Sequence, residues 1–107
     1  MVYTTSMMIQ EQFTRIAKAL ADPRRFEILA MIAAENEVAC KAMVEAFPVS
    51  QATISHHLKE LATAGLIDVR REGQSGYYRV RPGVLDDYLA EVAKRLHAAS
   101  PASISST

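Results

Sequence analysis

Apolar residues recur at spacings of three and four along the first half of the chain, a pattern typical of helices that cover a core. Residues 7 to about 21 show it first. Asp22 and Pro23 then give a strong start signal, an N-cap acid followed by proline at the first helical position. The second helix is expected to run to about Ala34 and, being apolar over most of its circumference, to lie centrally. A short third helix is expected over roughly 39–46.

The stretch from Ser50 to Gly65 predicts a well-delimited helix with two different faces. Ser50 is a good N-cap, and Gly65 suits the left-handed turn that follows a helix. At about 100° per residue, Leu58 and Leu61 fall within about 40° of Ile54 and form an apolar stripe. The opposite face is short and polar, with one full charge: Ala52, Thr53, Ser55, His56, Lys59 and Thr63. Such a face suits base edges in a DNA groove, which favours a recognition helix over a surface helix that is merely rich in Ser and Thr.

Two short segments after this helix predict a β-hairpin. Residues 66–71 and 77–81 have strand character, and residues 72–76, with two glycines, predict the turn between them. A short helix, a tight turn, a longer helix and then a hairpin form a winged helix-turn-helix domain, in which the hairpin is the wing. The arms of the wing hold four arginines that could reach phosphates beside the groove, or could simply be solvated: Arg70, Arg71, Arg79 and Arg81.

A last helix is expected to open at Pro82 and to carry a long apolar stripe. A domain this small leaves little for that stripe to cover except part of the first helix or a second subunit. We therefore expect a homodimer through the first and last helices, with these interface residues: Ile9, Phe13, Leu85, Tyr88, Leu89, Val92 and Leu96. Twofold symmetry would present two recognition helices to successive major grooves, about 34–36 Å apart, and predicts a palindromic operator.

The fold class expected is mainly α with a small β-hairpin (α+β), in which four helices precede two strands and a fifth helix. Residues 7–97 form the single DNA-binding and dimerisation domain. Residues 1–6 are expected to be flexible, and the serine-rich tail 98–107 is expected to be disordered.

The 107 residues carry no net charge, which argues against nucleic-acid binding by bulk charge alone. The distribution is more informative. Residues 50–81 hold five basic and three acidic side chains, net +2, whereas residues 1–49 and 82–107 are each net −1. A symmetric dimer would double this positive excess on one face.

Cys40 is the single cysteine, so no intramolecular disulfide can form, which fits a reducing cytosol. No stretch approaches the roughly 18 apolar residues of a membrane span, and the N-terminus lacks the apolar region of a signal peptide. We expect a cytoplasmic protein with no membrane partner.

Four segments resemble the ArsR/SmtB family of winged helix-turn-helix repressors, in register over roughly residues 13–96. They are ALADPRRFEIL at 19–29, VSQATISHHLKEL at 49–61, AGLI at 64–67 with RREG at 70–73, and YYRV at 77–80. The resemblance implies a homodimeric transcriptional repressor that binds double-stranded DNA until an inducer lowers its affinity. The inducer itself is unidentified.

The resemblance also implies which side chains contact DNA. It places base-reading positions on Gln51, Thr53, Ser55 and His56 and phosphate contacts on Lys59, Arg70 and Arg71, and the wing arginine Arg79 completes the predicted DNA-binding set. His57 lies about 60° from Ile54 at the edge of the core. We therefore expect a structural role for His57 rather than a base contact.

The family is best known for sensing metals, but its metal-site motifs are not intact in this chain. The Cys-x-Cys of its arsenic, cadmium or lead site would fall on Ala39 and Lys41, with Cys40 between them. A lone thiol cannot supply the multi-thiolate site that such metals need. The Asp-x-His of its zinc or nickel site is interrupted at Tyr88 and Leu89. We expect no metal and no cofactor.

Other functions stay open at this point. Cys40 with His56 or His57 could form a nucleophile and base, but the chain has no glycine-rich phosphate loop and little room for a substrate cleft, so we expect no enzyme. A winged helix used for protein–protein contact is a stronger alternative. So is a repressor that responds to a metal or to thiol oxidation at a non-standard site, although a buried inert thiol is more common.

Overall fold

The computed structural model describes residues 8–98, so the segments expected to be flexible or disordered, 1–6 and 98–107, lie outside them except for Ala98. The elements follow one another as helix α1 (Gln10–Ala21), helix α2 (Pro23–Ala34), strand β1 (Val38–Ala39), helix α3 (Cys40–Ala46), helix α4 (Gln51–Thr63), strands β2 (Ile67–Glu72) and β3 (Ser75–Val80), and helix α5 (Val84–Ala98). Five helices with a small sheet confirm the predicted mainly α class.

The helix boundaries follow from the capping residues. The Asp22 side chain accepts a hydrogen bond from the Arg25 amide at 2.9 Å, and Pro23 takes the first position of α2. The Ser50 hydroxyl accepts from the Thr53 amide at 3.1 Å and starts α4. After α4 the chain turns at Gly65, whose φ of 82° strongly favours a residue without a Cβ.

The sheet has three antiparallel strands in the order β1-β3-β2, one more than the predicted hairpin. Val38 and Ala39 pair with Tyr78 and Tyr77, so β3 lies between two neighbours. Two residues are too few for an alternating pattern, and their partner strand is about 40 positions away, so local periodicity cannot detect β1. The wing turn is also shorter than expected, because Glu72 pairs directly with Ser75.

The core lies where α1, α2, α3 and α4 cover one face of this sheet. Its side chains come from every predicted apolar stripe except that of the last helix, and all are buried: Ile16, Ala19, Ile28, Leu29, Ile32, Val38, Met43, Ile54, Leu58, Leu61, Ala64, Leu66, Ile67 and Tyr78. The apolar face of α4 is therefore the one read from the sequence. Phe26, on the predicted central α2, is an exception that remains 53% exposed.

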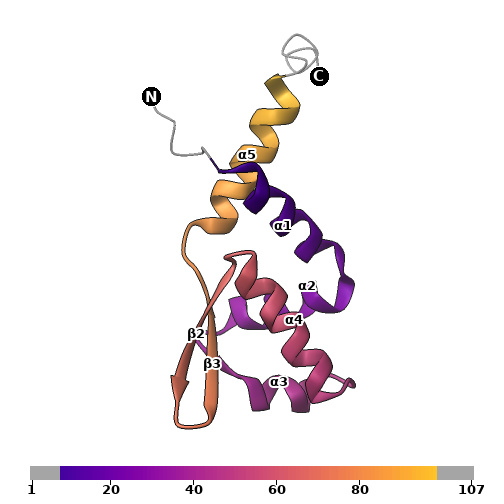
Figure 1. Ribbon diagram of the computed structural model, residues 1–107, viewed down its shortest axis with the longest axis vertical. Helices are drawn as coiled ribbons and strands as arrows, with labels where there is room; N and C mark the ends of the chain where they lie inside the picture. The colour runs from indigo at the N-terminus through magenta and orange to yellow at the C-terminus, as the bar shows by residue number, and fades with distance from the viewer. Residues whose placement is uncertain (1–7, 99–107) are drawn as a thin grey trace.

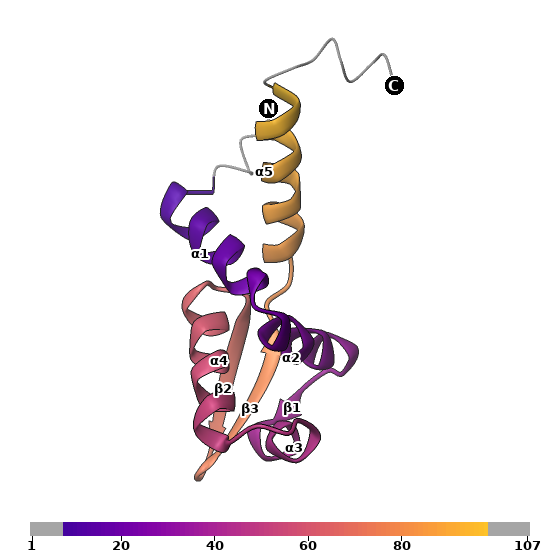
Figure 2. The same cartoon turned by 90° about the vertical axis from the view of Figure 1, so that its right-hand side faces the viewer.

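The molecule is elongated, measuring 52 × 27 × 23 Å, because α5 projects from the body beside α1 (Figures 1 and 2). The wing turn, α3 and the beginning of α4 gather at the opposite end from α5 (Figure 1). Within residues 8–98, no helix is long and apolar enough to cross a membrane.

Candidate nucleic-acid interface

Helices α3 and α4 form the helix-turn-helix, with a tight connection over 47–50. The Val49 amide donates to the Phe47 carbonyl at 2.8 Å within it. The polar face of α4 then points away from the core, with these predicted contact residues exposed: Gln51, Ser55, His56 and Lys59. Thr53 is only half-buried, but its hydroxyl lies 3.0 Å from that of Ser50, so it shares in the cap. Four of the five predicted helix residues are therefore exposed, and Gln51, Ser55 and Lys59 line the side of α4 that faces the wing.

The two adjacent histidines face different surroundings, as the helical wheel predicted. His56 is exposed, whereas His57 is 7% exposed and its Nδ1 accepts a hydrogen bond from the Arg25 Nε at 3.3 Å. Burial lowers the pKa of His57 below its ordinary value, against a smaller opposing effect of the Asp22 carboxylate. A neutral His57 keeps a lone pair for Arg25. His57 therefore packs against the core and bonds to the Arg25 side chain, as expected for a structural role.

Arg70, a predicted phosphate contact, already has acidic partners. Its Nε and Nη2 donate to the two carboxylate oxygens of Glu37 at 3.0 and 2.9 Å, and its Nη1 donates to Glu72 at 3.1 Å. Its guanidinium also lies 4.6 Å from the centre of the Tyr77 ring. These hydrogen bonds lower the pKa of Glu37 below its ordinary value. A phosphate contact by Arg70 would have to compete with this bidentate pair.

The other wing arginines differ from Arg70 and from one another. Arg81 faces Asp68 at 3.7 Å, whereas neither Arg71 nor Arg79 forms an ion pair with any residue in the described range 8–98. Arg71 and Arg70 are neighbours on β2 and therefore point to opposite faces of the wing. Arg71 lies on the face toward α4. The sequence alone could not distinguish Arg70 from Arg71, because the bidentate partner of Arg70, Glu37, lies 33 positions away along the chain.

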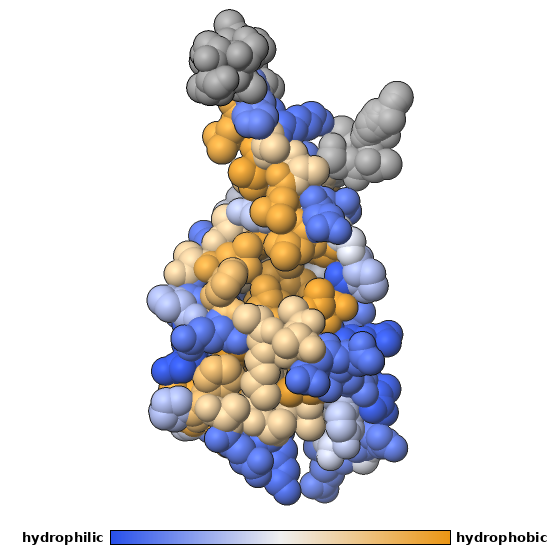
Figure 3. Space-filling model, turned by 180° about the vertical axis from the view of Figure 1, so that it is seen from behind, coloured by the Kyte–Doolittle hydropathy of each residue, from blue (hydrophilic) through white to orange (hydrophobic). Residues whose placement is uncertain are grey.

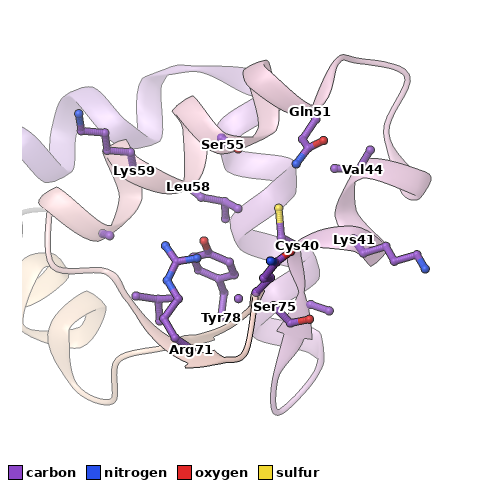
Figure 4. Close-up of a pocket in the computed structure, with 15 residues that line it drawn as sticks. Cys40, Lys41, Val44, Gln51, Ser55, Leu58, Lys59, Arg71, Ser75 and Tyr78 are labelled. Atoms are coloured by element: carbon purple, nitrogen blue, oxygen red, sulfur yellow. The ribbon is translucent and has the colours of Figure 1, made fainter.

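A groove of about 600 Å³ separates α4 from the wing. Its walls come from α4, from the junction of β1 and α3, and from the inner face of the wing: Ala39, Cys40, Lys41, Val44, Gln51, Ser55, Leu58, Lys59, Ala62, Val69, Arg71, Gln74, Ser75, Gly76 and Tyr78. Figure 4 shows the Cys40 sulfur directed toward Gln51 at one end and Arg71 beside Tyr78 at the other. The sequence did not reveal this groove.

The predicted dimer residues form a separate, apolar surface on α1 and α5. Figure 3 shows a band of hydrophobic side chains that runs along the projecting α5 and continues onto the body. Ile9, Leu89 and Leu96 are 64%, 54% and 68% exposed. The remaining predicted residues are half-buried: Phe13, Leu85, Tyr88 and Val92. Phe13 and Tyr88 stack with ring centres 5.2 Å apart and join the two helices.

A charged pair on α5 with a buried carboxylate lies against α1 and was not predicted. Glu91 is 6% exposed, and its Oε2 accepts from the Arg95 Nε at 2.8 Å. Arg95 also donates to the Gln10 side chain at 2.8 Å and lies 3.8 Å from the centre of the Phe13 ring. The Oε1 of Glu91 is buried without a hydrogen-bond partner among the described residues. The i,i+4 Glu-Arg spacing within an apolar stripe is the only sequence signal for this pair.

Possible metal ligands are sparse in the part of the chain that the structure describes. Residues 8–98 contain no group of three or more His, Cys, Asp or Glu side chains arranged to hold an ion. Cys40 is half-buried at the start of α3 and is a free thiol.

Comparison with known proteins supports the assignment of the fold. A helix-turn-helix domain family matches residues 20–70. The arsenical resistance operon repressor of Staphylococcus aureus is 34% identical over 82 residues, which are 77% of this chain and 78% of the relative. The solution structure of the homodimeric winged helix-turn-helix DNA-binding domain Mb0332 of Mycobacterium bovis is 35% identical. It covers 82% of this chain and 84% of its own, with a TM-score of 0.65. An ArsR-like transcriptional regulator of Rhodococcus sp. RHA1 shares the fold, with 24% identity over 90% of this chain and 89% of its own and a TM-score of 0.74.

The helix-turn-helix, the polar face of α4 and the arginine-bearing wing define a winged helix-turn-helix transcriptional regulator. The extent of the similarity to curated repressors settles the family. The chain belongs to the ArsR/SmtB family of regulators.

Proposed function

We propose that this protein is a homodimeric repressor that binds a palindromic operator and acts in the cytoplasm. The observation that carries the proposal is the exposed polar face of α4 beside a wing arginine without an ion pair. Gln51, Ser55 and His56 supply hydrogen-bonding groups for base edges in the major groove, and Thr53 lies beside them. Lys59, Arg71 and Arg79 supply the positive charges for flanking phosphates.

Arg70 has a different role in the proposed complex. Its hydrogen bonds to Glu37 hold the wing against the residue that precedes β1. Because both carboxylate oxygens accept from one guanidinium, the pair fixes geometry as well as charge. Arg70 therefore sets the position of the wing, and a phosphate reaches it only by exchange with a carboxylate.

The dimer is supported by the apolar surface of α1 and α5. An isolated chain leaves Ile9, Leu89 and Leu96 more than half exposed on neighbouring helices, and a second copy would remove them from water. The Mycobacterium bovis domain with the same fold is described as homodimeric. Two-fold pairing through these helices separates the two α4 helices and presents both to one face of DNA.

A gel-shift titration across salt tests the proposal, with a promoter palindrome compared against random DNA of equal length. His56→Ala is expected to relax sequence preference, with a cost of about 1–3 kcal/mol for a lost base contact. Arg71→Ala is expected to weaken all sequences and to reduce the salt slope by about one. Arg70→Ala is expected to weaken binding by releasing the wing from Glu37, but to change the salt slope less than Arg71→Ala, because carboxylates already pair with its charge. Equal affinity for palindrome and random DNA would exclude a sequence-specific repressor.

The same gel-shift titration distinguishes two alternative functions. A winged helix used only for protein–protein contact would show no salt-dependent DNA binding at all. A repressor that senses a metal or an oxidant through a non-standard site would lose operator affinity when Zn²⁺ or a disulfide reagent is added. The inducer is unidentified, so both additions belong in the first titration.

A further inference from the structure

The groove between α4 and the wing is lined by both cationic and apolar side chains, and the DNA-binding proposal accounts only for the cations. Arg71 and Lys59 are cations suited to a phosphate. The lining also holds the Cys40 thiol, near Gln51 and Lys41, and these apolar side chains: Ala39, Val44, Leu58, Ala62 and Val69. A DNA phosphate makes no favourable contact with apolar side chains. The volume of about 600 Å³ lies within the range of small-molecule sites.

Arg71 and Tyr78 together form a built site within the groove. Tyr78 is 8% exposed, and its hydroxyl receives no hydrogen bond from, and donates none to, any residue between 8 and 98. Tyr78 lines the groove together with Arg71, which likewise has no ion pair among those residues. A phenolic O–H and a guanidinium without partners are two donors available to one anionic group.

Gly76 makes this convergence possible. It is buried in β3, and a Cβ placed there would lie 3.2 Å from both the Arg71 Nη1 and the Tyr78 hydroxyl oxygen. The missing side chain therefore leaves room for both donors above the strand. Figure 4 shows Arg71 and Tyr78 beside each other under Leu58, with Cys40 across the groove.

We propose that this groove binds a small organic anion, with its anionic group on Arg71 and Tyr78 and its apolar body against Leu58, Val44 and Cys40. The effect of such an anion on DNA binding rests on the proposed repressor function. Gln51, Ser55, Lys59 and Arg71 line the groove and also belong to the DNA-contacting set. Occupancy by the anion and binding of the operator therefore exclude each other, so the groove is the site of a directly competing inducer.

The test uses 8-anilinonaphthalene-1-sulfonate, a sulfonate with an apolar body, and the single cysteine of the chain as a position-specific reporter. Bound probe is expected to shield Cys40 from N-ethylmaleimide. The alkylation rate should fall by a factor of about 1 + [L]/Kd, where [L] is the free probe concentration, which is about tenfold at ten times Kd. Inorganic phosphate is the control for an anion without an apolar body and should protect far less at equal concentration.

Variants assign the binding to the groove. Arg71→Gln is expected to weaken the probe about tenfold, and Tyr78→Phe about three- to tenfold, since each removes one donor to the sulfonate. Tyr77→Phe is the matched control, because it removes a hydroxyl from the opposite face of the same strand, and it should leave probe affinity unchanged. Operator duplex should displace the probe in the unmodified protein.

The outcomes separate the two proposals. Probe fluorescence without protection of Cys40, or without response to Arg71→Gln and Tyr78→Phe, places the probe elsewhere and overturns the groove site. Absence of probe binding with intact operator binding overturns the groove site and leaves the repressor proposal standing. Protection of Cys40 in a protein that binds no operator supports the site but overturns both the repressor and the competition. Simultaneous binding of probe and duplex also overturns the competition.

Discussion

Replacement of Gly65 by alanine tests how helix α1 supports the end of α4. Gly65 has a φ of 82°, and an added Cβ would lie 2.9 Å from the Gln12 Nε2. That amide donates to the Ala64 carbonyl at 3.4 Å, so it cannot move away without loss of its contact to α4. Gly83 is the matched control, because its φ is 83° and nothing lies within 4 Å of its added Cβ.

The two substitutions share one cost and differ in another. An L-residue in the left-handed region costs about 1–2 kcal/mol, and the loss of unfolded-state entropy returns about 0.4–1 kcal/mol. Gly83→Ala is therefore expected to destabilise by about 0 to 1.6 kcal/mol. Gly65→Ala also disrupts the Gln12 hydrogen bond, a further loss of about 0.5–1 kcal/mol for a bond of this length.

Thermal unfolding at one fixed protein concentration measures this difference, since a dimer has a concentration-dependent Tm. A further loss of about 1 kcal/mol corresponds to a Tm lower by about 4–8 °C for a domain near this size. Gly65→Ala should therefore unfold several degrees below Gly83→Ala. Equal Tm values for the two variants would refute the argument that Gln12 braces the end of α4, and an unchanged Tm for both would refute the conformational argument.

Three further outcomes are expected. Burial lowers the pKa of His57 below the value of 6.5 expected in the unfolded chain, so the unfolded chain binds more protons and stability should fall as the pH drops below about 6.5. This pH dependence should shrink in His57→Gln and persist in the variant of the exposed histidine, His56→Gln. Identical pH profiles of Tm for all three proteins would count against buried His57 as its source. Ser50→Ala removes the cap bond to the Thr53 amide and should lower the free energy of unfolding in urea by about 1 kcal/mol. Operator affinity should also fall, because the first turn of α4 is no longer held in place. Unchanged affinity would show that this turn reads no bases. Ile54→Ala, at 0% exposure, should cost about 2–5 kcal/mol, and a loss under about 1 kcal/mol would mean that the core collapses around the deletion.

The helices could be predicted because their signals are local. Asp22-Pro23, Ser50 and Gly65 each act within one turn, and the structure places helix ends within a residue or two of those signals. The apolar stripe of α4 was likewise predictable, since one face of one helix meets the core. Strand β1 could not be predicted, because its two residues form a strand only through pairing with β3.

The residue types of the candidate DNA-binding site could be predicted from the sequence, but the ion pairs that those residues form could not. The sequence marked Arg70 and Arg71 alike as phosphate contacts, yet Glu37, 33 positions from Arg70, pairs with Arg70, whereas no acidic residue in the described range pairs with Arg71. The groove was missed for a similar reason. Its walls come from α3, α4 and the wing, and the gap above Gly76 becomes evident only when Arg71 and Tyr78 are placed in space.

The outer edge of the sheet has a consequence for how copies of this chain associate. Strand β2 is paired with β3 on one side only, and four of its six residues are charged: Asp68, Arg70, Arg71 and Glu72. An exposed strand edge is a template for aggregation, and charged side chains are a common defence against it. The wing charges therefore also resist edge-to-edge growth into fibres through β2, and the proposed dimer through α1 and α5 does not use this edge.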